Sequence, residues 1–326
     1  MSSYIPVMND DGGGTSDIMR KRLKAITLAL AMIATNPATG QQGFNPVDAA
    51  KNGWSMEQNR SANWHLAQHK RLASAIAALQ PQRNGVIDSY VVSIGLDSDS
   101  VFSKEASEAA KVLSRRYGAI GRTIYLAAGA DDQSVGTPQG SPPNLATALA
   151  AVASKMNLKE DVLVLFTTSH GDPNSGLAYR DGEKGIGMIA PVRLARLLDD
   201  LGFERRMILL SACYSGVFLP LLTNENTVIV TAAASNRTSF GCAPGNDWTF
   251  FGDALINNSL RKPQSFENAT AEAVNLISTW ESSKQLIPSR PQIFIGEKAN
   301  VWLAPLEAKM PKTDTPKVGK PAIESF

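Results

Sequence analysis

The chain has 326 residues, of which 43% are hydrophobic and 19% charged, so it has enough apolar material for a core and is not a disordered, collagen-like or coiled-coil protein. Its formal net charge is +2, with basic and acidic residues interleaved, so nothing favours a nucleic acid as partner. Two cysteines are too few for a disulfide framework, and each thiol is therefore considered separately.

The first 40 residues have the features of a leader. Residues 1–18 are rich in glycine, aspartate and serine; a basic cluster then begins at Met19, and an apolar run (25–34) and small residues follow, in the order of a signal peptide. The apolar run is too short to span a bilayer. We predict translation from Met19, a mature chain that begins near Gln41, and a periplasmic or secreted bacterial protein with no lasting membrane anchor. An amphipathic helix with a basic cap is the alternative.

Residues 41–85 form the next segment, in which one amphipathic pattern predicts a helix over residues 60–79. His65 and His69 lie four residues apart on it, but the glutamate that a zinc-peptidase helix needs between them is absent. They are interpreted as surface residues, and no metal site is predicted. The segment is compatible with a propeptide, an extra helix on the domain or a cover over the cleft.

From residue 86 to 304, short apolar runs alternate with amphipathic patterns, which is typical of a parallel sheet with helices on both faces. The predicted strands cover residues 89–96, 123–127, 161–168, 206–211, 227–233 and 292–296. The first predicted helix opens at Ser103, and the others cover residues 144–156, 192–201, 247–260 and 266–281. We expect one α/β domain with a six-stranded sheet, followed by a disordered tail over residues 305–326, which are rich in proline and lysine.

The motifs of common α/β enzymes are missing from the sequence. No glycine pattern of a phosphate-binding or dinucleotide-binding loop follows the first predicted strand. No Gly-x-Ser-x-Gly segment indicates a serine hydrolase. We therefore expect no nucleotide or other cofactor.

Two strand ends carry residues with chemistry. The third predicted strand ends before His170-Gly171, and the fourth ends at Ser211, directly before Ala212-Cys213. Since ligands bind beyond the carboxyl ends of parallel strands, neighbouring strands would bring the thiol within reach of an imidazole that accepts its proton. We predict Cys213 as nucleophile, His170 as general acid/base, and the backbone N–H groups of Gly171 and Cys213 as an oxyanion hole. An inert thiol and a structural histidine are the alternative.

These residues resemble the legumain-type cysteine peptidases, relatives of the caspases, in their bacterial branch. The resemblance runs from Tyr90 to Gly296 and rests on VLVLFTTSHGD, RMILLSACYSG, Val101-Phe102 with Glu105, Thr231-Ala232-Ala233, Arg237 to Cys242, and Asp247-Trp248. It implies a caspase-like three-layer sandwich that cleaves a peptide or protein substrate through a thioacyl-enzyme. A transamidase with the same residues and an idle peptide-binding module are the alternatives.

The resemblance also bears on specificity. Legumains hold an asparagine before the cut with an arginine, a glutamate two residues before the cysteine and an aspartate beside a tryptophan. These roles fall at Ser103, Ser211 and Asp247, so the substrate-binding aspartate alone is retained and asparagine specificity is not predicted. Cys242 follows the fifth predicted strand and is a candidate redox partner for Cys213, with an unpaired buried thiol as the alternative.

Overall fold

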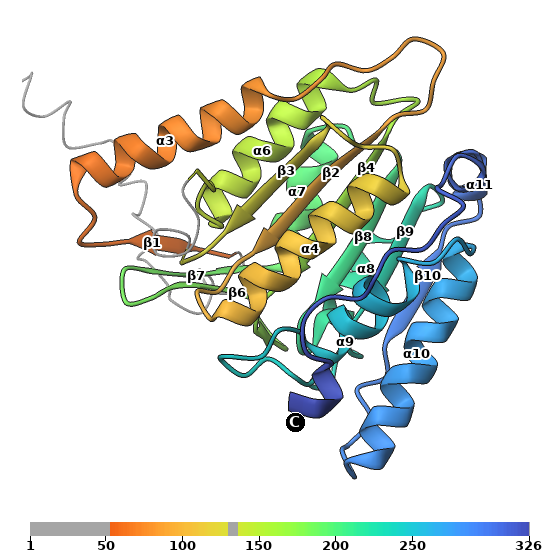
Figure 1. Ribbon diagram of the computed structural model, residues 1–326. Helices are drawn as coiled ribbons and strands as arrows, with labels where there is room; N and C mark the ends of the chain where they lie inside the picture. The colour runs from red at the N-terminus through yellow and green to blue at the C-terminus, as the bar shows by residue number, and fades with distance from the viewer. Residues whose placement is uncertain (1–52, 130–135, 326) are drawn as a thin grey trace, which may run out of the picture. The chain divides into compact units, whose positions relative to one another are not determined.

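The computed structural model describes residues 53–129 and 136–325, all of which lie within one compact unit that spans Pro46–Phe326. Its central strands are β2 (Ser89–Gly95), β3 (Thr123–Ala127), β4 (Val162–Thr168), β8 (Arg206–Ser211), β9 (Thr227–Thr231) and β10 (Gln292–Ile295). They form one sheet in the order β10-β9-β8-β4-β2-β3, in which only β10 runs antiparallel to its neighbour (Figure 1). The predicted six-stranded, mostly parallel sheet is confirmed.

Side chains of each central strand alternate between two hydrophobic layers, one on each face of the sheet. On β8, Met207 and Leu209 belong to one layer, and Ile208 and Leu210 belong to the other. The first face is covered by α4 (Ser100–Arg116), α10 (Phe266–Ser283) and α11 (Asn300–Ala308), and the second by α6 (Pro142–Lys155), α7 (Pro191–Asp200) and α8 (Leu219–Leu222) (Figure 1). Because both faces are buried, the strands consist of nearly continuous apolar residues. The predicted three-layer arrangement is confirmed.

The helix predicted over residues 60–79 is also present, as α3 (Ala62–Ala77). Ser61 caps it by accepting a hydrogen bond from the N–H of Trp64, which satisfies one of the free donors at the helix start. The helix predicted over residues 247–260 is replaced by a short turn, α9 (Phe250–Gly252), and a π-helical segment, η2 (Asp253–Ser259). Thr249 delays the start because its hydroxyl caps α9 at the N–H of Gly252.

A second, antiparallel sheet is absent from the sequence prediction. It consists of β1 (Ser55–Glu57), β7 (Gly185–Ile189), β6 (Gly176–Asp181) and β5 (Gly171–Asp172), in that order. The turn between β6 and β7 contains Gly182 at a φ of +58°, a conformation that glycine adopts without steric cost. Asp181-Gly182 is a hairpin signal that the sequence does contain, but the glycine-rich strands beside it hide the alternation. Because β5 begins directly after His170, this sheet borders the predicted active site.

The C-terminal residues correct a prediction, because they are ordered rather than a disordered tail. The helix α11 continues to Ala308, and the chain then returns along η2. Trp248 Nε1 donates to the carbonyl of Val318 (2.8 Å), and the N–H of Ala322 donates to Asp253 Oδ2 (2.7 Å). The composition of the tail indicated too little apolar surface for it to be ordered. The structure instead holds the backbone of the tail by hydrogen bonds to side chains of another segment, and such bonds cannot be predicted from composition.

The predicted leader, residues 1–40, lies outside the described residues, so the signal peptide and the export of the protein stay predictions. Within the residues that the structure describes, every helix is too short or too polar to cross a membrane. For the segment 41–85, the structure describes residues from Gly53 onward, where β1 and α3 pack with the rest of the domain.

Candidate active site

The register of two parallel strands brings His170 and Cys213 to the same edge of the sheet. β4 and β8 are neighbours, and Thr168 of β4 is paired with Ser211 of β8. His170 and Cys213 each follow two residues after this pair, so they leave the sheet at the same level. The His170 side chain is 40% exposed and Cys213 is half-buried, which leaves both accessible to a peptide. The predicted condition, that the two strands are neighbours, is met.

Gly171 allows the two strand ends to approach each other. A Cβ atom at this position would collide with the carbonyl oxygen of Cys213 and lie 3.0 Å from its carbonyl carbon. The N–H of Ser169 donates to the carbonyl of Ser211 (3.1 Å), which extends the strand pairing toward the site. The close approach of backbone to backbone is therefore the physical reason for glycine after the histidine.

The two predicted oxyanion-hole donors are the N–H groups of Gly171 and Cys213. The N–H of Ala178 donates to the carbonyl of His170 (3.0 Å), so His170 and Ala178 form a hydrogen-bonded pair of the antiparallel strands. Such pairs alternate with non-hydrogen-bonded pairs, and the next pair, Gly171–Leu177, is of the second kind. The strand pairing therefore does not use the N–H of Gly171. The N–H of Cys213 has no acceptor among the described residues. Neither N–H therefore donates to another described residue, and the oxyanion hole stays a prediction.

Cys213 lies at the sharp turn between β8 and the 3-10 helix η1 (Ser215–Phe218). The next residue, Tyr214, has a φ of +57°, which is uncommon for a residue other than glycine, asparagine or aspartate. Cys213 Sγ accepts a hydrogen bond from the N–H of Ser239 (3.3 Å) and lies 3.6 Å from the hydroxyl of the same residue. Ser239 is thus a neighbour of the candidate nucleophile, and the sequence analysis did not identify it.

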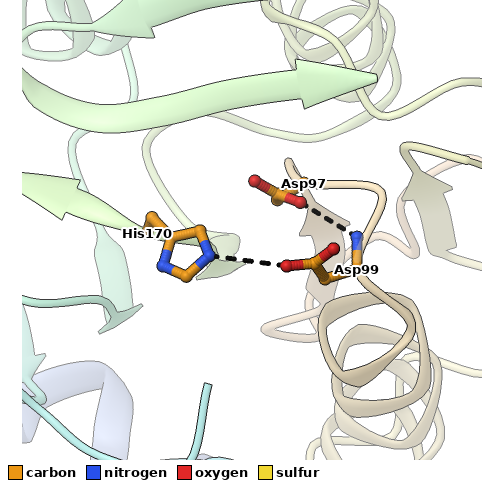
Figure 2. Close-up of side chains that lie close together, drawn as sticks. All are labelled: Asp97, Asp99 and His170. Atoms are coloured by element: carbon orange, nitrogen blue, oxygen red, sulfur yellow. Dashed lines mark hydrogen bonds and ion pairs between the residues drawn. The ribbon is translucent and has the colours of Figure 1, made fainter. Parts of the chain in front are cut away.

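His170 contacts Asp99 of the loop between β2 and α4 (Figure 2) and Phe102 of α4. Its Nε2 atom lies 3.7 Å from Asp99 Oδ2, and its ring meets Phe102 edge-to-face at 5.0 Å between centroids. Asp99 occupies the N-cap position of α4, yet its side chain makes no hydrogen bond to the helix and instead faces His170. Arg180 of β6 pairs with the same Asp99 oxygen at 2.8 Å.

Asp97, Asp99 and His170 bring their ligand atoms close enough together to suggest a cation site. Both carboxylates, however, already pair with a cationic side chain. Arg180 pairs with both oxygens of Asp97 (2.9 and 3.0 Å) and with Asp99, and Asp97 Oδ1 also accepts the N–H of Asp99 (Figure 2). The cluster is therefore an ion-paired network that holds Asp99 beside His170. In the sequence, the signal of this network is Asp97 and Asp99, which follow the first predicted strand at the point where a phosphate-binding pattern is missing.

Ser211 takes the position of the legumain glutamate, but its hydroxyl is fully occupied inside the protein. It donates to Glu105 Oε1 (2.6 Å), and Glu105 Oε2 accepts the N–H of Thr249 (2.9 Å). Burial raises the pKa of the Glu105 carboxyl, while the hydrogen bonds from Ser211 and Thr249 oppose this shift. A carboxyl group thus lies next to the expected strand position, but it comes from α4 and is closed off from solvent.

The other predicted specificity residues also have partners within the chain. Asp247 pairs with Lys104 (2.7 Å) and accepts the N–H of Lys320 (2.8 Å); the hydrogen bond from Lys104 is the main reason that the pKa of Asp247 is lowered. Ser103 lies within α4, and its hydroxyl donates to the carbonyl of Ser100 (3.1 Å). The substrate-binding roles of these residues stay predictions.

Cys242 is a half-buried free thiol, and Cys213 is free as well. Burial, followed by the charge of Cys213, raises the pKa of the Cys242 thiol to about 11. A thiol is a weak nucleophile well below its pKa, so Cys242 is poorly suited to attack at neutral pH. Its predicted role as a redox partner stays a prediction.

Comparison with known proteins bears on this site. Residues 144–292 match the model of the Peptidase C13 family, a stretch that contains both His170 and Cys213. The crystal structure of caspase-1 from Spodoptera frugiperda is similar to this chain with a TM-score of 0.43 and 10% sequence identity, over 66% of this chain and 92% of the caspase. No protein of curated function matches the sequence.

Proposed function

We propose that this chain is a cysteine-type peptidase related to the legumains and that it cleaves peptide bonds through a thioacyl-enzyme formed on Cys213; the match of residues 144–292 to the Peptidase C13 family supports the proposal. The observation that carries the proposal is the register of β4 and β8. Thr168 is paired with Ser211, and His170 and Cys213 each follow this pair by two residues. A thiolate nucleophile and an imidazole base at one sheet edge are the components that this reaction needs.

In the proposed acylation step, Cys213 gives its proton to His170, and Sγ forms a bond to the carbonyl carbon of the substrate. The carbonyl oxygen becomes an oxyanion, which the N–H groups of Gly171 and Cys213 stabilise. The C–N bond then breaks, His170 returns the proton to the departing amine, and a thioester remains on Cys213. Two free backbone donors beside the nucleophile support this assignment.

In deacylation, water gives a proton to His170 and its oxygen attacks the thioester. The C–S bond breaks, the proton returns to Sγ, and a carboxylic acid leaves. An amine in place of water would give a new peptide bond. We propose hydrolysis because His170 is exposed, so water reaches the base directly.

Among the described residues, no hydrogen bond joins Cys213 and His170. Cys213 Sγ instead accepts a hydrogen bond from the N–H of Ser239. Catalytic hydrogen bonds are often formed only when substrate binds. A change of the Cys213 rotamer toward His170 is therefore part of the proposal. Asp99, held by Arg180, keeps the imidazole in place during that change.

The test is a mass-spectrometric cleavage profile of a diverse peptide library with the full chain under reducing conditions. We expect cleavage by the native protein and by Cys242→Ala, and none by Cys213→Ala or His170→Ala. Equal cleavage by the native protein and Cys213→Ala would refute the assignment of the nucleophile. A folded, reduced protein that cleaves nothing would favour the peptide-binding alternative.

We further propose that the chain is exported, on the basis of the leader pattern in residues 1–40. N-terminal sequencing of the protein from its producing cell tests this. We expect a terminus near Gln41, and a mature protein that retains Met1 or Ser2 contradicts export by signal cleavage.

A further inference from the structure

The loop after β9 contacts Cys213 and the residue that follows it, Tyr214. The N–H of Tyr214 donates to the carbonyl of Arg237 (2.8 Å), and the N–H of Gly216 donates to the carbonyl of Ala233 (2.9 Å). Two residues after Arg237, Ser239 bonds to Cys213 Sγ. The backbone of Arg237 is thus hydrogen-bonded to Tyr214, the residue that follows Cys213.

Arg237 forms no ion pair with another residue that the structure describes. The side chain is half-buried, and its Nε atom is shielded from solvent with no acceptor. No carboxylate within residues 53–129 and 136–325 pairs with it. An N–H group that has lost its water and found no acceptor is unfavourable, so a guanidinium in this state binds an anion readily.

The other charged groups around the site are already paired. Arg180 is shared by Asp97 and Asp99, and Lys104 pairs with Asp247. Glu105 is fully buried against Ser211 and Thr249. Among the described residues, Arg237 is therefore the cation on the loop beside Cys213 that has no ion-pair partner.

We propose that Arg237 is a specificity-determining residue that binds a side-chain carboxylate of the substrate, so that the enzyme acts after aspartate or glutamate. The inference rests on the proposed function, because it takes Cys213 as the nucleophile. The carbonyl that Sγ attacks belongs to the residue before the cut, and the loop that carries Arg237 contacts Cys213 Sγ through Ser239 and the N–H of Tyr214 through the carbonyl of Arg237. A planar guanidinium matches a carboxylate with two parallel hydrogen bonds.

The test uses peptidyl acyloxymethyl ketones that differ only in the last residue: Asp, Asn, Ala or Lys. The Cys213 thiolate displaces the carboxylate leaving group and forms a thioether, so the rate of labelling, followed by intact mass, reports recognition without peptide turnover. We expect the Asp probe to label native protein about tenfold or more faster than the Asn probe, its neutral isostere.

Two variants and a control isolate the charge. Arg237→Gln slows labelling by the Asp probe about tenfold and leaves the Ala probe unchanged. Arg237→Glu reverses the order, so that the Lys probe reacts fastest. The control is Arg196→Gln, which removes an exposed arginine of α7 and leaves the preference for Asp intact.

The outcomes separate this inference from the proposed function. Labelling of Cys213 at equal rates by the Asp and Asn probes overturns the inference and leaves the nucleophile established, and this comparison needs no variant to fold. A preference for Asp that persists in Arg237→Gln also overturns it. Failure of every probe to label Cys213 in folded, reduced protein overturns both.

Discussion

Replacing Gly171 by alanine tests whether the close approach of the two strand ends is needed for catalysis. The new Cβ atom would collide with the carbonyl oxygen of Cys213, lie 3.0 Å from its carbonyl carbon and lie 3.3 Å from the Cβ of Ala212. Non-bonded carbon atoms prefer about 3.5 to 4.0 Å, so the ends of β4 and β8 must move apart. Backbone atoms surround the new methyl group, so no flexible side chain can make room for it.

The loss of stability and of activity in Gly171→Ala can be derived from the displacement of the two strand ends. Inserting one methyl group into a packed region costs about 1 to 3 kcal/mol of unfolding free energy. Catalysis is more sensitive, because a displacement of about 1 Å costs about 100-fold and a lost oxyanion donor costs about 100- to 1000-fold. We expect kcat/KM of Gly171→Ala to fall about 100- to 1000-fold in a protein that still folds.

Urea unfolding gives the stability, and peptide cleavage gives the activity. The control is Gly118→Ala, at the end of α4, where φ is +65° and no atom lies within 4 Å of the new Cβ. In this variant, backbone strain lowers the free energy of unfolding by about 1 to 2 kcal/mol. Cys213 is not displaced, so we expect unchanged activity. If Gly171→Ala keeps activity within twofold of the native enzyme, the approach of the strand ends is not what positions the nucleophile.

Three further predictions concern charged groups and thiols of the site. Asp99→Asn lowers kcat about tenfold at constant KM, because a neutral amide holds the imidazolium form of His170 less well; steady-state kinetics that show no change contradict this role. The pKa of Glu105 is raised by burial, so the free energy of unfolding of native protein falls as the pH rises above the unfolded-state pKa of about 4.3, and Glu105→Gln removes that slope in urea titrations between pH 4 and 8. Iodoacetamide at pH 8 modifies Cys213 and spares Cys242, whose pKa of about 11 delays its alkylation to strongly basic pH; mass spectrometry that finds Cys242 modified first refutes the assignment.

The central sheet and the two main site residues were predictable because the relevant signals are local. β8 is a run of buried apolar residues with Ser211 at its end, and both faces of the sheet bury such a run, so the pattern is strong. His170 and Cys213 were found because strand ends in a parallel sheet lie at one edge, a rule that needs only the order of the strands.

The network behind His170 was not predictable for the opposite reason. Asp97 and Arg180 are 83 residues apart in sequence, and their pairing depends on the hairpin of β6 and β7 folding onto the loop after β2. A charged residue in a loop has no periodicity that identifies its partner. The same holds for Trp248 and Val318, 70 residues apart, whose hydrogen bond keeps the C-terminal segment in place.

By itself, the sequence determined the α/β class, the six strands, the nucleophile and base candidates, and Gly171 as a candidate donor to the oxyanion. Only the tertiary structure decided what surrounds them: Asp99 beside His170, Ser239 beside Cys213, Glu105 buried under Ser211, and an Arg237 with no ion-pair partner among the described residues. The difference has a physical cause. Burial of apolar residues leaves a repeating pattern along the chain, whereas a hydrogen bond or ion pair depends on a distance of about 3 Å between atoms that only the folded chain brings together.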